Sequence, residues 1–294
     1  MSPTALSDHR KRLLLTAVGG LALSVDIPLV RLGDGDIWSI LGVRSAATVL
    51  ATFLILGAIR LAWGRWPVLV PGRAGLLAGL LYGLSSLTFV LAVFNTATAN
   101  VVFIVAFNPM FGALLSWTFL KEKPQAATLI AMLFMIVGVG LIVSDGLSSG
   151  HFFGDAMAIV SALILASAIT IGRASRRDMG FVPLLAAILP AALGLAQALP
   201  SGLSIAHPGW VLLNGAIVMP VAFWCLATGP RYLSAPEVGM FYLLETVLAP
   251  IWVWLIFAEM PATMTLVGGG ILVAAIAAHS GWMVRRKSRR PLAE

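Results

Sequence analysis

Two long stretches of this chain contain no Asp, Glu, Lys or Arg: one runs from Ala74 to Leu120 and the other from Met179 to Pro230. A helix that spans a bilayer needs about 20 apolar residues. Each stretch is therefore long enough for two such helices, and turn-forming residues interrupt each one near its middle, at 94–98 and at 200–208. A chain that must shield two such stretches from water is predicted to be an integral membrane protein.

The composition excludes an ordinary soluble protein. Apolar residues make up 60% of the chain and charged residues only 11%, whereas a soluble domain carries about a quarter charged residues. The single cysteine, Cys225, excludes an internal disulfide and a metal site built from cysteines. The four histidines are scattered without the spacing of metal ligands, so no metal and no cofactor is expected.

Ten spanning helices are predicted, with short connections between them. Besides the two pairs in the uncharged stretches, single spans are expected at 13–32, 37–59, 124–144, 155–174, 234–258 and 262–284. The first could imitate a secretory signal peptide, but Asp26 and Pro28 interrupt its apolar run, so we interpret it as a retained helix. The expected fold class is an all-α polytopic membrane protein.

The basic residues select one orientation for this bundle. If the N-terminus is cytoplasmic, 17 of the 19 basic residues fall in cytoplasmic segments, which is the distribution that the positive-inside rule predicts. Arg31 alone falls in an outer segment, and Arg44 falls inside a span. The 17 are Arg10, Lys11, Arg12, Arg60, Arg65, Arg73, Lys121, Lys123, Arg173, Arg176, Arg177, Arg231, Arg285, Arg286, Lys287, Arg289 and Arg290. The high pI thus reflects topology, and no nucleic-acid partner is expected.

The two halves of the chain match at an offset of 137 residues. This shift places Glu122-Lys-Pro124 and the following Thr-Leu on Glu259-Met-Pro261 and its following Thr-Leu. Each half has five spans, an odd number, so the second must enter the membrane from the opposite face. We divide the chain into a cytoplasmic tail (1–12), a first five-helix repeat (13–144), a second, inverted five-helix repeat (154–284) and a basic cytoplasmic tail (285–294).

The pattern resembles the EamA-type exporters of the drug/metabolite transporter superfamily. The resemblance lies in the two Glu-x-Pro joints, in Arg44 of the second helix and in Pro109 ahead of Glu122, and it covers residues 13–284. The chain has Glu245-Thr246 where such families often have Pro after the glutamate of the ninth helix. The resemblance implies export of metabolites or drugs across the bacterial inner membrane, and amino-acid exporters, including the aromatic amino-acid type, are the most similar group.

Polar residues on two repeat-related helices are the main candidates for the substrate site. Asn100, Ile104 and Asn108 share one face of the fourth helix, and the 137-residue shift carries them onto Glu237, Phe241 and Glu245 of the ninth. Asn108 and Glu245 are expected near the midplane of a cavity, although both could instead join helices through hydrogen bonds. An apolar setting disfavours the charged form of Glu245, which could exchange protons, donate a hydrogen bond while neutral, or bind a substrate ammonium.

Other candidates come from the remaining polar and aromatic residues in the spans. Asp26 and Arg44 are expected to form a structural ion pair, the alternatives being a substrate carboxylate on Arg44 or snorkelling to the interface. The substrate-binding set is Tyr82, Asn108, Glu245, Asn100, Ser24, Ser161, Tyr242, Phe241 and Trp224. Tyr82 matches an aromatic position in the third helix of amino-acid exporters. Ser24 and Ser161 are repeat-related and could equally satisfy their own helices.

The function predicted from these features is secondary export of small amphipathic metabolites, most plausibly neutral or aromatic amino acids, by a monomer in contact with membrane lipids. Alternating access through a midplane cavity is expected, with the fifth and tenth helices at the periphery. Protons are a candidate coupling ion. Alternatives are an exporter of drugs, purines or nucleotide-sugar-like metabolites, and a passive channel or non-transporting scaffold. No enzyme is expected, since the chain has neither a Walker loop nor a catalytic motif.

Overall fold

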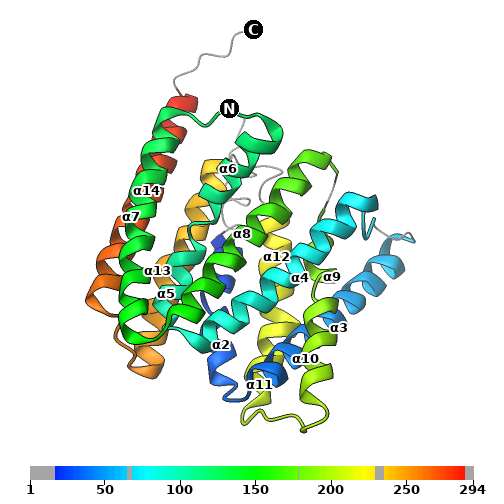
Figure 1. Ribbon diagram of the computed structural model, residues 1–294. Coiled ribbons are helices and arrows are strands. Elements are labelled where there is room, and N and C mark those ends of the chain that lie inside the picture. The colour runs from blue at the N-terminus through cyan, green and yellow to red at the C-terminus, as the bar shows by residue number, and fades with distance from the viewer. Residues whose placement is uncertain (1–16, 65–67, 178, 229–234, 289–294) are drawn as a thin grey trace, which may run out of the picture.

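The computed structural model describes residues 17–64, 68–177, 179–228 and 235–288; the side chains of 63, 226–243, 284 and 286–288 lie outside the described part. The described residues form helices joined by short loops (Figure 1). Residues 17–24 are helical and lead into α2. The helices that follow are α2 (Asp26–Leu32), α3 (Ile37–Trp63), α4 (Gly72–Asn95), α5 (Thr98–Val105), α6 (Asn108–Leu120), α7 (Ala126–Ser149), α8 (Phe152–Ser175), α9 (Val182–Leu185), α10 (Ile188–Ala198), α11 (Pro208–Leu213), η1 (Asn214–Val218), α12 (Met219–Thr228), α13 (Ala235–Phe257) and α14 (Thr263–Ser288).

These helices make ten spans. In the described part of the chain, seven are long and apolar enough to cross a membrane unaided, and two shorter apolar helices cover Val182–Ala198 and Leu244–Phe257. The tenth span is formed by residues 17–32. The predicted all-α membrane fold with ten spans is therefore confirmed.

Several spans consist of two shorter helices because a proline interrupts them. Proline lacks the N–H that would bond four residues back, so the helix loosens in the turn before it. The breaks at Val25, at Ala106–Phe107 and at Ala186–Ala187, and the π-helical segment η1, each precede a proline in this way; these prolines are Pro28, Pro109, Pro190 and Pro220. By contrast, α13 continues through Pro250.

The internal repeat is visible in the helix boundaries. The span formed by α5 and α6 and the span formed by α13 end 137 residues apart, at Leu120 and Phe257, and α7 and α14 begin with the same offset. Lys121 and Ala258, which follow the first pair of spans, are also repeat-related, and both adopt left-handed backbone conformations, with φ of 57° and 55°. Two five-helix repeats of inverted topology thus share their turn geometry as well as their sequence motif.

The spans pack chiefly in pairs: α4 lies against α8, α7 against α14 and α3 against α10. Figure 1 shows α7 and α14 side by side at one edge of the molecule. Glycines allow this pair to cross closely, since a Cβ on Gly138 would lie 2.7 Å from the backbone oxygen of Gly268. The outer faces of both helices expose large apolar side chains, among them Leu133 and Val267.

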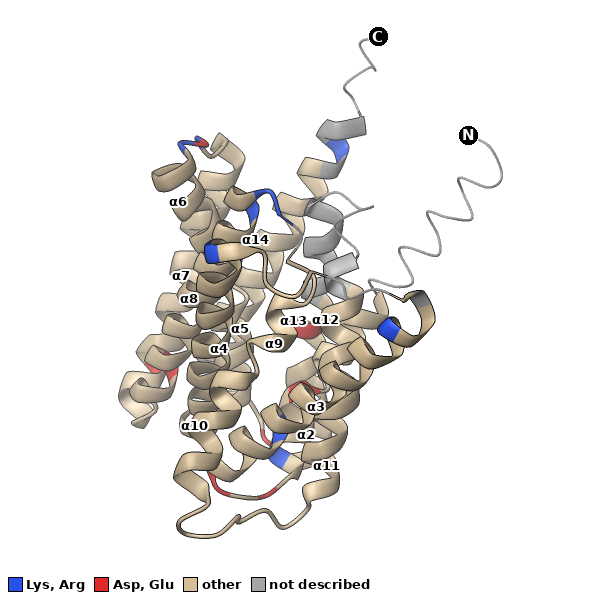
Figure 2. Ribbon diagram, turned by 90° about the vertical axis from the view of Figure 1, so that its right-hand side faces the viewer, with Lys and Arg blue, Asp and Glu red and all other residues tan. Residues whose placement is uncertain are grey.

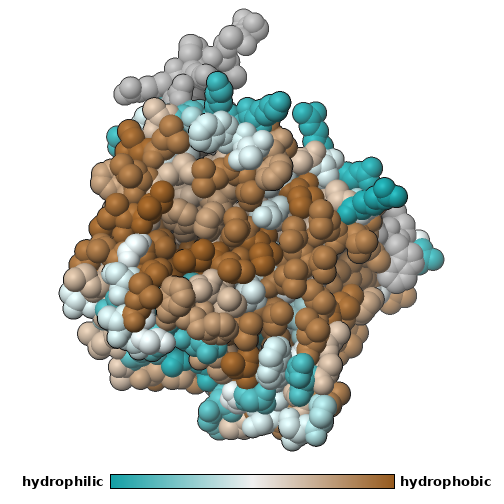
Figure 3. Space-filling view, viewed as in Figure 1, coloured by the Kyte–Doolittle hydropathy of each residue, from teal (hydrophilic) through white to brown (hydrophobic). Residues whose placement is uncertain are grey.

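The surface has an apolar band between two polar ends, as Figure 3 shows. Figure 2 shows most of the described Lys and Arg residues gathered at one end of the bundle, here called the basic end, where α3, α6, α8 and α14 finish. The opposite end, where α2 finishes, is called the Arg31 end. The chain is a multi-pass membrane protein whose two ends differ in charge.

Candidate functional site

A buried ion pair joins the first two spans. The Arg44 Nη2 atom donates to both oxygens of Asp26, at 2.8 and 2.9 Å, and both side chains are almost fully buried. The break at Val25 puts Asp26 at the start of α2, where its carboxylate faces α3. The structure thus brings together the two residues expected to pair.

Asn214, at the start of η1, completes this network. Its amide oxygen accepts from the Arg44 Nε–H at 2.8 Å, and its amide nitrogen donates to Asp26 Oδ1 at 2.7 Å. Arg44 Nη2 also lies 2.8 Å from the sulfur of Met219. The guanidinium is therefore surrounded by protein partners. The network ties the eighth span of the chain, which belongs to the second repeat, to the first two spans of the first repeat.

The repeat-related serines are held by neighbouring helices. Ser24 donates to the backbone oxygen of Leu21 at 2.8 Å and accepts from the Trp252 indole N–H at 3.1 Å. Ser161 exchanges hydrogen bonds with Ser85 of α4, and its hydroxyl donates to the Ser85 backbone oxygen at 2.9 Å. Both serines are buried. They link helices α8 to α4, and the first span to α13.

A second buried network surrounds Asp155 in the first turn of α8, a residue that the sequence analysis did not select. Its Oδ1 accepts from the Thr96 hydroxyl at 2.7 Å and from the Asn100 amide at 3.1 Å. Asn100 in turn accepts from the Thr265 hydroxyl at 2.7 Å. Asp155 Oδ2 is buried without a hydrogen-bond partner in the described part of the chain. It packs against Gly146, where an added Cβ would clash with it. Asn100 thus holds α5 to α8 and α14.

Three other candidates are only partly buried. Tyr82 of α4, Asn108 of α6 and Glu245 of α13 all have intermediate exposure. Within the described residues, the structure shows no hydrogen bond or ion pair from any of these three side chains. Asn108 and Glu245 are repeat-related, and Asn108 lies directly after the break between α5 and α6. Among the described residues, these three polar side chains are therefore partly exposed without a hydrogen-bonding partner.

The aromatic candidates divide into two groups. Trp224 of α12 is 56% exposed. The side chains of Phe241 and Tyr242, like that of Glu237, lie outside the described residues. Trp252, which the substrate-binding set omitted, contacts Ser24 through its indole N–H.

At the Arg31 end, an ion pair joins the two repeats. The Arg31 guanidinium pairs with Glu259 Oε2 and donates to the Thr98 hydroxyl at 2.9 Å. Glu259 Oε1 accepts from the Thr98 N–H at 3.2 Å and so caps the start of α5. The Arg31 guanidinium also lies 4.7 Å from the centre of the Phe257 ring.

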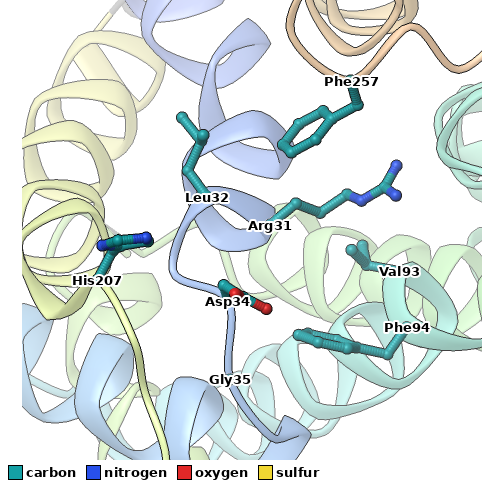
Figure 4. Close-up of a pocket in the computed structure, with 8 residues that line it drawn as sticks. All are labelled: Arg31, Leu32, Asp34, Gly35, Val93, Phe94, His207 and Phe257. Carbon is teal, nitrogen blue, oxygen red and sulfur yellow. The ribbon is translucent and has the colours of Figure 1, made fainter.

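Two hollows flank this ion pair. The smaller, of about 490 Å³, is lined by Arg31, Leu32, Asp34, Gly35, Val93, Phe94, His207 and Phe257. Figure 4 shows the Arg31 side chain passing between Phe257 on one side and Val93 and Phe94 on the other. The larger, of about 670 Å³, extends from Arg31 to His151 and includes Thr96, Asn100 and Thr265. Asp155 lies directly behind this wall, bonded to two of its residues.

These hollows differ in position from the expected cavity. They lie at one end of the bundle rather than at the midplane. The larger one is partly lined by Asp145 and Ser149 of α7 and by Thr265 of α14. The fifth and tenth helices, expected only at the periphery, therefore contribute their ends to a hollow while their middles expose apolar side chains.

The basic end carries a corresponding ion pair. Arg173, in the last turn of α8, donates to Glu122 Oε2 at 3.1 Å and to the Ser116 hydroxyl at 3.2 Å. The two charged side chains are 56% and 55% exposed, compared with 30% and 28% for Arg31 and Glu259. The described residues contain no group of three His, Cys, Asp or Glu side chains able to hold a metal ion.

Comparisons with known proteins agree with this architecture. Residues 11–144 match the EamA-like transporter family. A solved structure titled only "Crystal structure of protein" has a similar fold, with a TM-score of 0.67 and 17% sequence identity; the alignment covers 95% of this chain and 99% of that one. A comparison with curated proteins gives no match.

Proposed function

We propose that this chain is a secondary carrier exporting small amphipathic metabolites, with neutral and aromatic amino acids as its substrates. The match of residues 11–144 to the EamA-like transporter family supports a transport function. Alternating access between the inverted repeats would carry the substrate across the membrane. The family match supports transport of metabolites or drugs in general, and the amino-acid class rests on the arguments below.

The observation that carries the proposal is the state of Asn108 and Glu245. Polar groups at membrane depth are costly unless they have a partner. Most other polar side chains inside the bundle have protein partners, whereas these two repeat-related groups are partly exposed and have no hydrogen-bond or ion-pair partner among the described residues. An unengaged amide and carboxyl on corresponding helices suit a small molecule that carries its own donors and acceptors.

The charge balance favours a neutral or zwitterionic substrate. Arg44 is neutralised by Asp26 and surrounded by Asn214 and Met219, so it offers no free positive charge to an anion. Glu245 is the remaining carboxyl near the middle of the ninth span, and it can accept a hydrogen bond from an ammonium group. Tyr82 adds an aromatic surface with a polar end. An amino acid with a neutral side chain fits this set.

We further propose that the basic end faces the bacterial cytoplasm, with both termini inside. The basic residues described at this end include Arg60, Arg73, Lys123, Arg176 and Arg177, and such residues are retained on the cytoplasmic side. Export would then run from the basic end to the Arg31 end. Coupling to protons would pass through Glu245, either by titration of its carboxyl or by competition between a proton and the substrate ammonium.

Transport into proteoliposomes tests the substrate class. The purified protein is reconstituted and challenged with a panel of neutral, aromatic, acidic and basic amino acids, a purine, a nucleotide sugar and a cationic drug, with and without a pH gradient. Saturable transport of several neutral or aromatic amino acids supports the proposal. Transport confined to the purine, the nucleotide sugar or the drug would instead assign the alternative substrate classes, and non-saturable flux would indicate a channel.

A further inference from the structure

We propose that the ion pairs Arg31–Glu259 and Arg173–Glu122 are two latches that close opposite ends of the carrier and open in turn. Hereafter the first is called the Arg31 latch and the second the Arg173 latch. This inference rests on the proposed alternating access, and it gives a role to the repeated Glu-x-Pro motif.

The two latches are built from corresponding parts of the repeats. Glu122 and Glu259 are 137 residues apart, and each follows a residue in the left-handed conformation at the end of the fourth span of its repeat. Each glutamate pairs with an arginine near the end of the first span of the other repeat: Glu259 with Arg31 of α2, and Glu122 with Arg173 of α8. Each arginine also donates to a hydroxyl of the fourth span of the first repeat.

Inverted topology places the latches at opposite ends. Each connects the two repeats to one another, because its glutamate and its arginine come from different repeats. Opening one end of an inverted-repeat carrier requires the repeats to separate at that end while they remain together at the other. An inter-repeat ion pair at each end opposes this separation, so the two latches bias the equilibrium in opposite directions.

The Arg31 latch is less exposed to solvent and makes more contacts than the Arg173 latch. Its side chains are about half as exposed as those of the Arg173 latch. It also caps α5 through the Thr98 N–H, and its arginine lies over the Phe257 ring. Val93, which is 5% exposed, lines the smaller hollow beside Arg31. Access of reagents to position 93 therefore reports on opening at this end.

Thiol labelling from the Arg31 end tests the proposal without any substrate. In a Cys225→Ser background, Val93→Cys is reacted with a membrane-impermeant maleimide. Glu259→Gln keeps an oxygen for the Thr98 N–H but removes the charge, so it should raise the labelling rate about fivefold, the effect of losing roughly 1 kcal/mol. Glu122→Gln should lower the same rate, because it favours opening at the basic end.

Matched variants separate the latch from general loosening. Arg31→Gln breaks the Arg31 latch from its other side and should reproduce Glu259→Gln. Asp145→Asn removes a carboxylate from the larger hollow without touching either latch and should leave the rate unchanged. The proposal would be overturned if the labelling rate at position 93 changed in the same direction in Glu122→Gln and Glu259→Gln. It would also be overturned if neither variant changed the rate. Because no substrate is present, this outcome is independent of the substrate panel.

Discussion

The Asp26 carboxylate and the Arg44 guanidinium lie 2.8 Å apart inside the bundle, and each side chain is only 5% exposed. Asp26 opens a helix that restarts after a break, and Arg44 lies in the continuous helix beside it. Asn214 bonds to both, so the pair also fixes the π-helical segment of the eighth span. This network stabilises the contact between the repeats at a depth where unpaired charges are costly.

Removing one member of this pair should destabilise the protein strongly. Arg44→Met leaves the Asp26 carboxylate buried and uncompensated, which costs about 3–5 kcal/mol in comparable cases. Thermal unfolding in detergent measures the change. The double variant Asp26→Asn, Arg44→Met should lose less stability than Arg44→Met alone, and Arg60→Met, at the exposed end of the same helix, serves as the control. A double variant that is less stable than Arg44→Met would contradict this account.

The crossing of α7 and α14 should tolerate no side chain at Gly138. A Cβ there would lie 2.7 Å from the Gly268 oxygen and 3.0 Å from the Leu272 Cγ, whereas a Cβ on Gly140 meets nothing within 4 Å. Gly138→Ala should therefore lower stability by about 1–3 kcal/mol. Gly140→Ala, two residues away on the same helix, should be neutral or slightly stabilising. Equal melting temperatures for the two variants would show that the helices do not cross closely at Gly138.

The start of α3 should become less stable in acid. Burial alone would raise the pKa of the Asp36 carboxyl, but hydrogen bonds donated by Ser39, Trp38 and Ser204 outweigh it and lower the pKa below its usual range. A carboxyl whose pKa is lowered by folding stabilises the fold at any pH above its pKa in the unfolded chain, which is near 4. This stabilisation is lost as the pH falls through the lower pKa of the folded protein. Protection of the Trp38 and Ser39 amides from hydrogen exchange, measured against the intrinsic rate at each pH, should therefore fall below about pH 4. Asp36→Asn, which still caps the helix, should show a weaker pH dependence.

Much of the fold is predictable because the membrane imposes simple rules. The uncharged stretches predict spans, and the match of Glu122 with Glu259 predicts the repeat, since both depend on local sequence. The breaks before Pro28 and Pro109 likewise follow from the missing proline N–H. The left-handed conformations of Lys121 and Ala258 could not be predicted, because neither residue is the glycine that usually marks such a turn.

The site is less predictable because it depends on which helices meet. The sequence marks Asp155 only as the beginning of a span, and nothing in it places this residue against Thr96 and Asn100. Asn214 lies in an apolar stretch, and its role becomes clear only when η1 packs against Arg44. Roles for Tyr82, Asn108 and Glu245 in substrate binding remain predictions, and the hollows at the Arg31 end could not be foreseen from helix periodicity.

The most direct test of the central claim is pH-gradient-driven transport by Glu245→Gln in proteoliposomes, compared with wild type for whichever neutral amino acid the panel identifies. Gln keeps the shape and hydrogen bonding of Glu but cannot titrate. The account predicts that Glu245→Gln loses gradient-driven accumulation, and that Asn108→Ala weakens transport. Thr118→Ala, which alters an exposed hydroxyl on the same helix as Asn108, should behave as wild type. Wild-type accumulation by Glu245→Gln would contradict the account.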